Sequence, residues 1–239
     1  ATSGPCDVCL VLDGSGSMSG DAIRQSRAAL CAVAGALTDE DRIQVLRFGS
    51  NVVPLFRRPL KASARVRAAM SALAQTVDAN LGGTDMDEAL GAAMDALVDM
   101  APAEANARAI ILVTDGAIQP GELRAAQERA TETGVRIFVV AVGSSAGLDV
   151  LAPLAASTGA VLERAVPAEP IDEAVMRQLR RARQPQLEAE MHRGLHPRHR
   201  DVVAIADPGH LASLDRSFRL FEGHDVGQDL AGMREVGQP

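Results

Sequence analysis

Short runs of apolar residues alternate along this chain with longer stretches rich in alanine and leucine. The first run, at residues 8–12, contains no polar side chain and ends at Asp13, which is typical of a central strand buried on both faces. Residues 21–37 follow, with apolar side chains at helical spacing. About six such repeats predict an α/β fold with a doubly wound, mostly parallel six-stranded sheet and helices on both faces.

The remaining elements follow from the same alternation. The expected strands are residues 42–48, 51–56, 109–113, 135–142 and 160–164, and the expected helices are residues 64–77, 85–100, 121–133, 148–157 and 171–183. Gly49 and Ser50 form a tight turn between the strands at 42–48 and 51–56. This turn predicts a hairpin and an antiparallel strand at the sheet edge, where Pro54 is tolerated.

The composition changes after Pro185, which ends the last expected helix. Residues 186–239 contain all five histidines, together with two short candidate strands. We therefore divide the chain into an α/β domain at residues 1–184 and a C-terminal appendage at residues 185–239. The appendage adds a strand pair to the first domain or is a piece of a second one.

Three histidines of this appendage, His192, His196 and His199, lie at near-helical spacing, as zinc ligands can. Gly194 and Pro197 interrupt a helix there, and the segment has no cysteine to complete a zinc site. Arginines are interleaved with the histidines, so we interpret the segment as solvated and basic.

Composition and charge narrow the class of partner. Aromatic residues are only 2% of the chain, with neither Trp nor Tyr, and the formal net charge is −7. The scarcity of aromatic side chains almost excludes a stacking platform for single-stranded nucleic acid. The electrostatic field of a chain with a net negative charge repels a polyanion or an anionic membrane. No apolar run approaches the roughly 20 residues that a bilayer span requires. We expect a soluble protein whose partner is a protein, a cation or a small molecule, with no nucleic acid and no membrane span.

The three cysteines are an odd number, which fits a reducing compartment better than a disulfide framework. No signal segment opens the printed sequence, so we expect a cytoplasmic protein, or an extracytoplasmic one if a signal segment has been removed. The Cys6-x-x-Cys9 spacing is similar to a redox motif or half of a zinc site. Cys9 lies inside an apolar run and no second cysteine pair exists, so we expect buried thiols or thiols at a strand edge instead.

Side chains with oxygen ligands gather in three loops that end strands or open helices. They are Asp13, Ser15 and Ser17 after the first strand, Thr84 before a helix, and Asp115 after the fourth strand. In an open α/β sheet, ligands bind outside the carboxyl ends of the strands where the winding direction reverses, so these residues are expected to converge. Two carboxylates and three hydroxyls, without Cys or His, suit a hard cation such as Mg²⁺.

The composition of this set also predicts what the site can capture. Two aspartates balance the charge of a dication, and Gly14, Gly16 and Gly83 shape the loops so that their backbone approaches the ion closely. If one of the aspartates binds partly through water, one coordination position stays free for an outside ligand. A carboxylate from another protein fits that position best.

These residues resemble the metal-ion-dependent adhesion site of the von Willebrand factor A domain, which has an Asp-x-Ser-x-Ser loop, a Thr in a second loop and an Asp in a third. The match is complete, and the resemblance covers about residues 5–184. The run at residues 17–20 and the hairpin around Gly49 look most like bacterial and inter-alpha-trypsin-inhibitor-type members. Asp85 departs from the family, whose members commonly carry Asn there; the extra carboxylate either tightens cation binding or weakens the capture of an acidic partner.

The resemblance implies an adaptor or scaffold without enzymatic activity. It implies that the chain holds Mg²⁺, with Mn²⁺ in its place and Ca²⁺ as a further candidate, and that it captures an Asp or Glu of a partner protein. Bacterial relatives often work beside AAA-type ATPases, kinases or stress and defence assemblies, so a partner of that kind is implied as well.

Two other interpretations use the same loops. The glycines of the first loop resemble a dinucleotide-binding fingerprint, but their spacing is one residue too long and Asp13 would face the pyrophosphate. The competing function is a metal-dependent hydrolase, in which Asp115 or Asp85 activates a metal-bound water. Such an enzyme needs a further base or a cationic clamp near the metal, whereas these loops offer hydroxyls and carboxylates.

Overall fold

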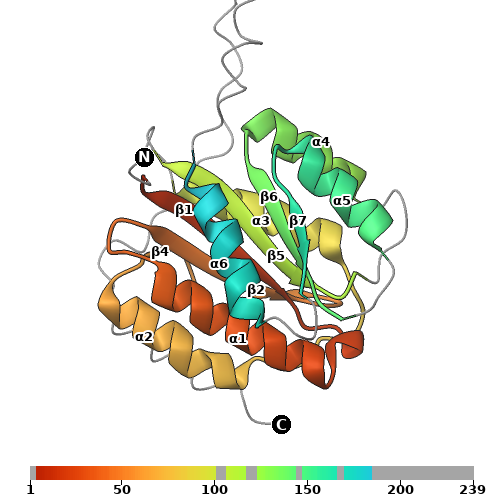
Figure 1. Ribbon diagram of the computed structural model, residues 1–239, viewed down its shortest axis with the longest axis horizontal. Coiled ribbons are helices and arrows are strands. Elements are labelled where there is room, and N and C mark those ends of the chain that lie inside the picture. The colour runs from red at the N-terminus through yellow and green to blue at the C-terminus, as the bar shows by residue number, and fades with distance from the viewer. Residues whose placement is uncertain (1–3, 101–105, 117–122, 144–146, 166–169, 185–239) are drawn as a thin grey trace, which may run out of the picture.

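The computed structural model describes residues 4–100, 106–116, 123–143, 147–165 and 170–184, and in it a twisted sheet lies between two layers of helices (Figure 1). The strands are β1 (Cys6–Asp13), β2 (Arg42–Phe48), β3 (Val52–Pro54), β4 (Leu60–Lys61), β5 (Ala107–Thr114), β6 (Arg136–Ala141) and β7 (Leu162–Arg164). Their order across the sheet is β3-β2-β1-β5-β6-β7, and β4 also pairs with β2.

Most of the sheet is parallel. β1, β2, β5, β6 and β7 run in the same direction, whereas β3 and β4 are antiparallel to β2. The expected α/β fold with an antiparallel edge strand is therefore confirmed, and the hairpin turns at Gly49, whose N–H donates to the carbonyl of Asn51 (3.1 Å). β4 is an addition to the six expected strands, because two residues are too few to show an alternating pattern.

Helices cover both faces of the sheet (Figure 1). One layer contains α1 (Asp21–Ala36), α2 (Ala64–Leu73) and α6 (Ile171–Ala182), and the other contains α3 (Met86–Asp99), α4 (Arg124–Thr133) and α5 (Leu148–Ser157). Side chains of β1 alternate between the layers: Val8, Leu10 and Leu12 join the core with α1, while Cys9 and Val11 join the core with α3. None of the described helices combines the length and hydrophobicity that crossing a membrane requires.

Some boundaries differ from those expected. α2 ends at Leu73 and passes into a single 3₁₀ turn, η2 (Ala74–Thr76), where the apolar spacing suggested one continuous helix. Ala74 and Val77 are nevertheless buried in the core, so this segment still packs on the sheet although it does not continue the α-helix. The expected start of α4 at residue 121 and the whole appendage at residues 185–239 lie outside the described residues, so the division into two domains stays a prediction.

The winding direction of the chain reverses between β1 and β5. From β1 the chain passes through α1 to β2 on one side, whereas β5 leads through α4 to β6 and then to β7 on the other. β1 and β5 are adjacent, and Leu12 pairs with Val113 one residue before each strand ends. The carboxyl ends of these two strands therefore meet at the switch point, where ligands of such sheets bind.

A buried ion pair joins three segments at the amino ends of β1 and β2, opposite the switch point. Asp41, in the loop before β2, accepts hydrogen bonds from both Nη atoms of Arg183 (3.0 and 2.7 Å), directly after α6. The same carboxylate accepts the backbone N–H of Cys6 (2.9 Å) and of Thr38 (2.6 Å). The end of α6 is thereby tied to the beginning of β1 and to the loop after α1.

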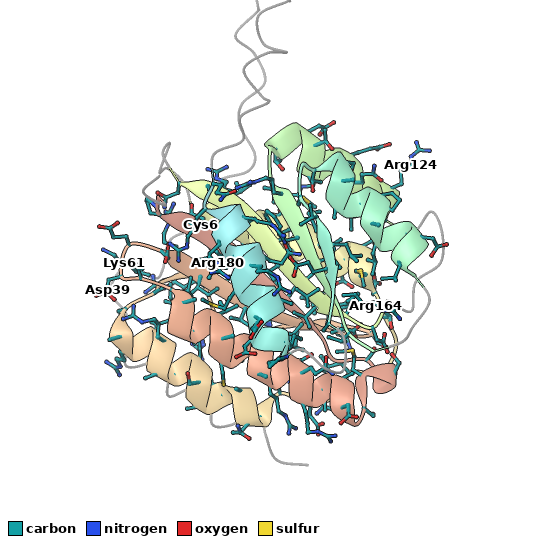
Figure 2. All side chains as sticks on the ribbon, viewed as in Figure 1. Cys6, Asp39, Lys61, Arg124, Arg164 and Arg180 are labelled. Carbon is teal, nitrogen blue, oxygen red and sulfur yellow. The ribbon has the colours of Figure 1, made fainter. Side chains whose placement is uncertain are left out.

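The first two cysteines belong to opposite faces of the sheet. Cys6, near the start of β1 (Figure 2), lies in the core with α1, and Cys9 lies in the core with α3, so the pair cannot share a metal ion. Burial raises the pKa of the Cys6 thiol to about 12 and also raises that of Cys9. Both thiols are thus buried, which is one of the two alternatives expected from the sequence.

We expect one cysteine of the native protein to react with iodoacetamide at about pH 8, because Cys31 is exposed on α1 whereas the other two thiols are buried and protonated. Mass spectrometry should show a single adduct on the native protein and three adducts after denaturation in guanidinium chloride. A second adduct that forms on the native protein as fast as the first would contradict the buried position of β1.

Candidate metal centre

Asp13 is the last residue of β1, and its side chain is fully buried. Its Oδ1 accepts the backbone N–H of Ser15 (2.9 Å), and its Oδ2 accepts the hydroxyl of Thr114 (2.6 Å). Thr114 is the last residue of β5, so the second hydrogen bond joins the two strands at the switch point. The carboxylate of Asp13 is therefore held in place from both sides.

The surroundings of Asp13 disfavour a negative charge. Burial is the main cause that raises the pKa of this carboxyl, and the nearby carboxylate of Asp115 raises the pKa further. Hydrogen bonds from Ser15 and Thr114 act in the opposite direction. Two carboxylates that repel each other in a poorly solvated place are stabilised by a cation.

The loop after Asp13 brings two hydroxyls together. It contains a single 3₁₀ turn, η1 (Gly16–Met18), which is closed by a hydrogen bond from the N–H of Met18 to the carbonyl of Ser15 (3.1 Å). The Oγ atoms of Ser15 and Ser17 lie 3.0 Å apart. Ser15 is buried and Ser17 is exposed, so this loop presents one sheltered and one accessible hydroxyl.

The loop that contains Thr84 is fastened to the first loop through backbone atoms. The N–H of Gly16 donates to the carbonyl of Gly82 (3.0 Å), and the N–H of Leu81 donates to the carbonyl of Gly14 (2.9 Å). Thr84 is half-buried and lies two residues beyond Gly82. The fold thus brings the loop with Thr84 beside the loop with the two serines.

A third segment, the turn formed by Gly49 and Ser50 after β2, also contacts this loop; we name it the 49–50 turn. Ser50 donates its N–H to the carbonyl of Leu81 (2.7 Å) and accepts the N–H of Gly83 on its Oγ (2.8 Å). The sequence identified Gly49 and Ser50 only as turn formers. Glycine and serine have the same local signature in a hairpin whether or not another loop packs on them, so no signal in the sequence reveals this contact.

Asp115 directly follows β5 and is 7% exposed. Its Oδ1 is buried and has no hydrogen-bond partner among the residues that the structure describes. The next residue, Gly116, donates its N–H to Oγ1 of Thr114 (3.1 Å). Gly116 also packs so closely on Gly147 that a Cβ added to Gly147 would collide with the carbonyl group of Gly116. The backbone around Asp115 is held firmly, while one of its carboxylate oxygens is left without a donor.

A surface cleft of about 510 Å³ lies next to Thr84. It is lined by Ser50, Thr84, Asp85, Met86 and Asp87. Asp85 is exposed and caps α3, because it accepts the N–H of Glu88 (3.2 Å). Asn and Asp are about equally good helix caps, which is a sufficient structural reason for an aspartate at this position.

The donors at the switch point suit a hard cation. No group of three His, Cys, Asp or Glu side chains that could hold a metal forms within the described ranges, so an ion at this place depends on two carboxylates, on hydroxyls and on water. Such oxygen donors are the ligands that Mg²⁺ and Mn²⁺ prefer. The unpaired Oδ1 of Asp115 fits the same role.

The sequence model of the von Willebrand factor type A domain matches residues 7–167. A von Willebrand factor A domain-containing protein of Dictyostelium discoideum is 28% identical over 180 residues, which are 74% of this chain and 19% of that protein. Inter-alpha-trypsin inhibitor heavy chain H4 of Homo sapiens is 29% identical over 176 residues, which are 68% of this chain and 18% of that protein.

Among solved structures, a von Willebrand factor type A protein from Catenulispora acidiphila is similar, with a TM-score of 0.67 and 20% identity over 75% of this chain and 43% of that one. Similarity at this identity shows the fold alone. The chain spans about a fifth of the length of the curated relatives named above.

Proposed function

Because this chain belongs to the von Willebrand factor type A domain family, we propose that it is a metal-dependent protein-interaction module. Domains of this family are typically adhesion or interaction modules, often bind divalent cations through a metal-ion-dependent adhesion site, and are usually not catalytic. The cation in our proposal is Mg²⁺, or Mn²⁺ in its place. The residues that would hold it are Asp13, Ser15, Ser17, Thr84 and Asp115.

The observation that supports this proposal best is the unpaired oxygen of Asp115. A buried polar group without a partner costs about 1–3 kcal/mol, and more when it is charged, and the described part of the chain supplies no donor for Oδ1. On the adjacent strand, the pKa of Asp13 is raised by burial and by the charge of Asp115. A dication bound by both carboxylates would remove both penalties at once.

A bound dication would supply a positive charge and a Lewis-acidic position open to an outside ligand. The chain itself contributes two carboxylates that match the charge of the ion, and neutral oxygens from Ser15, Ser17 and Thr84. A partner Asp or Glu makes a charge-assisted contact at such a position. Since the net charge of the chain is −7, an acidic partner is otherwise repelled, and the local attraction must come from the metal site.

We expect Thr84→Ala to weaken Mn²⁺ binding and to abolish capture of the partner protein, because it removes a neutral donor without changing the charge of the site. Isothermal titration calorimetry with Mn²⁺ measures the first effect. Pull-downs from a lysate, with and without EDTA, measure the second, and partner binding should vanish with EDTA and return with added Mg²⁺ or Mn²⁺.

The matched control for this experiment is Ser71→Ala, which removes an exposed hydroxyl of α2 that donates to the carbonyl of Arg67 in the same helix (3.3 Å). This variant should behave as the wild type in both measurements. A partner that is captured in the presence of EDTA and by Thr84→Ala would show that another surface makes the contact.

No specific feature favours the competing hydrolase function. Hydrolysis would need a base or a free cationic group beside the metal site. The only lysine of the chain, Lys61, lies elsewhere, and the guanidinium of Arg47, near the end of β2, already donates to the carbonyl of Asp78 and to Oδ1 of Asn80. Lys61 lies on β4 and pairs with Arg42 at the amino end of β2. Arg164, the last residue of β7, marks the carboxyl ends of the parallel strands, where the candidate metal site lies. Figure 2 shows Lys61 and Arg164 on opposite sides of the molecule.

For the partner we propose an AAA-type ATPase, a kinase or another subunit of a stress or defence assembly, and for the location the cytoplasm. The resemblance to bacterial members of the family supports the first proposal, and the cysteine content of the chain supports the second. Mass spectrometry of proteins that an EDTA wash releases from the immobilised chain tests the class of partner. Membrane-surface proteins or extracellular proteins in that eluate would contradict both proposals.

A further inference from the structure

The backbone on both sides of Thr84 is held by the 49–50 turn. Gly83, directly before Thr84, donates its N–H to Oγ of Ser50 (2.8 Å). Asp85, directly after Thr84, donates its N–H to the carbonyl of Gly49 (2.7 Å). Thr84 is thus bracketed by two hydrogen bonds to the same turn, which limits how far its side chain can move relative to β2.

The contact between the turn and the loop requires glycine at position 49. A Cβ on Gly49 would lie 2.5 Å from Cβ of Leu81 and 2.6 Å from its carbonyl carbon. Gly49 is not among the glycines with positive φ, so the requirement comes from the close approach of Leu81 and not from an unusual backbone conformation. Any larger residue at position 49 would therefore push the turn away from the loop that contains Leu81 and Thr84.

The turn is itself fixed to the strand that carries Asp13. Phe48, the last residue of β2, is paired with Asp13 in the parallel register, and its carbonyl accepts the N–H of Gly14 (2.7 Å). One residue earlier, Arg47 donates from Nη2 to the carbonyl of Asp78 (2.6 Å) and to Oδ1 of Asn80 (2.7 Å), at the beginning of the loop. Asp13 and Thr84 are therefore connected through β2 by short, mostly backbone contacts.

We infer that the 49–50 turn is a positioning element of the metal site: it sets the distance of Thr84 from Asp13 and thereby the affinity for the cation, without touching the ion. This inference rests on the proposed function. Mg²⁺ demands near-ideal octahedral geometry, so a small displacement of one donor weakens binding. Groups that orient metal ligands typically change the affinity by about 10- to 100-fold when they are replaced.

The experiment compares Ser50→Ala with Ser50→Thr in the full chain, with Mn²⁺ as the probe. Ser50→Ala removes the acceptor for Gly83, and we expect the Kd for Mn²⁺ in titration calorimetry to rise about tenfold. Ser50→Thr keeps the hydroxyl oxygen and should restore the Kd to within about twofold of the wild type. Ser50 is exposed, so the thermal midpoint of the metal-free protein should be unchanged in both variants. A merely structural role would not produce this combination.

Each outcome decides the inference. A wild-type Kd in Ser50→Ala, together with weakened binding in Thr84→Ala, would overturn the positioning role and leave the proposed function standing. Equal losses in Ser50→Ala and Ser50→Thr, or a lowered thermal midpoint that accompanies the loss in Ser50→Ala, would also overturn it, because the hydroxyl would then not act through the position of Thr84. A wild-type chain that binds no Mn²⁺ would overturn the positioning role together with the proposed function.

Discussion

Replacing Asp41 by alanine is expected to lower the free energy of unfolding by about 3–5 kcal/mol, the typical cost of breaking a buried ion pair. Asp41 is fully buried, and the side chain of its partner Arg183 is only 10% exposed. The substitution leaves the guanidinium without its carboxylate and also removes the acceptor for the N–H groups of Cys6 and Thr38. Urea unfolding followed by far-ultraviolet circular dichroism measures the change, since the chain has no Trp or Tyr for fluorescence.

Two variants make this result specific. Asp39→Ala removes an ion pair with Arg67 in which the aspartate is 72% exposed, so it should cost less than about 1 kcal/mol. The double variant Asp41→Ala/Arg183→Met should recover part of the loss, because it no longer buries an unpaired charge. A cost for Asp41→Ala no larger than that for Asp39→Ala would show that the end of α6 is not held by this pair.

Replacing Asp115 by alanine is expected to abolish the stabilisation of the protein by Mg²⁺ or Mn²⁺ while it leaves the metal-free stability nearly unchanged. Because Oδ1 of Asp115 has no donor among the described residues, truncation breaks no hydrogen bond at that atom and relieves the repulsion of Asp13. When the free concentration of the ion is ten times its Kd, binding adds about 1.4 kcal/mol to the free energy of unfolding of the wild type. Thermal unfolding with and without the ion measures the difference.

Asp13→Ala is the informative comparison, because it should lose the stabilisation by the ion and also part of the metal-free stability. The Asp13 carboxylate accepts hydrogen bonds from the N–H of Ser15 and the hydroxyl of Thr114, and both donors are buried. Leaving them unpaired should cost about 1–3 kcal/mol in the metal-free protein, in addition to the lost response to the ion. If Asp115→Ala kept the response, or lost as much metal-free stability as Asp13→Ala, the assignment of Asp115 as a metal ligand would be wrong.

Elements with a strong local pattern could be predicted from the sequence. The run at residues 8–12 lies inside β1 (Cys6–Asp13), and the helix expected at residues 148–157 is α5 (Leu148–Ser157). A strand buried on both faces gives a continuous apolar run, and a helix with one apolar side gives apolar residues at helical spacing, so both can be recognised from a short stretch of sequence. β4 (Leu60–Lys61) could not be predicted, because two residues become a strand only through pairing with β2.

The candidate site was predictable in its residue types and in its place on the fold, but not in its contacts. The order of the loops along the chain and the rule for open parallel sheets placed Asp13 and Asp115 at one edge, and in the structure their strands are adjacent. The assignment of the metal ligands stays a prediction. The hydrogen bonds of Ser50 with Gly83, next to Thr84, and of Thr114 with Asp13 had no signal in the sequence, because serine and threonine are common at the ends of strands and in turns.

The α/β fold, the antiparallel edge strand and the kinds of side chain at the carboxyl ends of the strands follow from the amino-acid sequence, because they depend on local hydrophobic patterns and on the order of elements. Two features follow only from how the chain packs: Oδ1 of Asp115 has no donor among the described residues, and the 49–50 turn hydrogen-bonds to the backbone on both sides of Thr84. The physical reason is that hydrogen bonds between distant segments depend on backbone positions to a few tenths of an ångström. Those positions are set by strand register and by contacts such as that of Gly49 with Leu81.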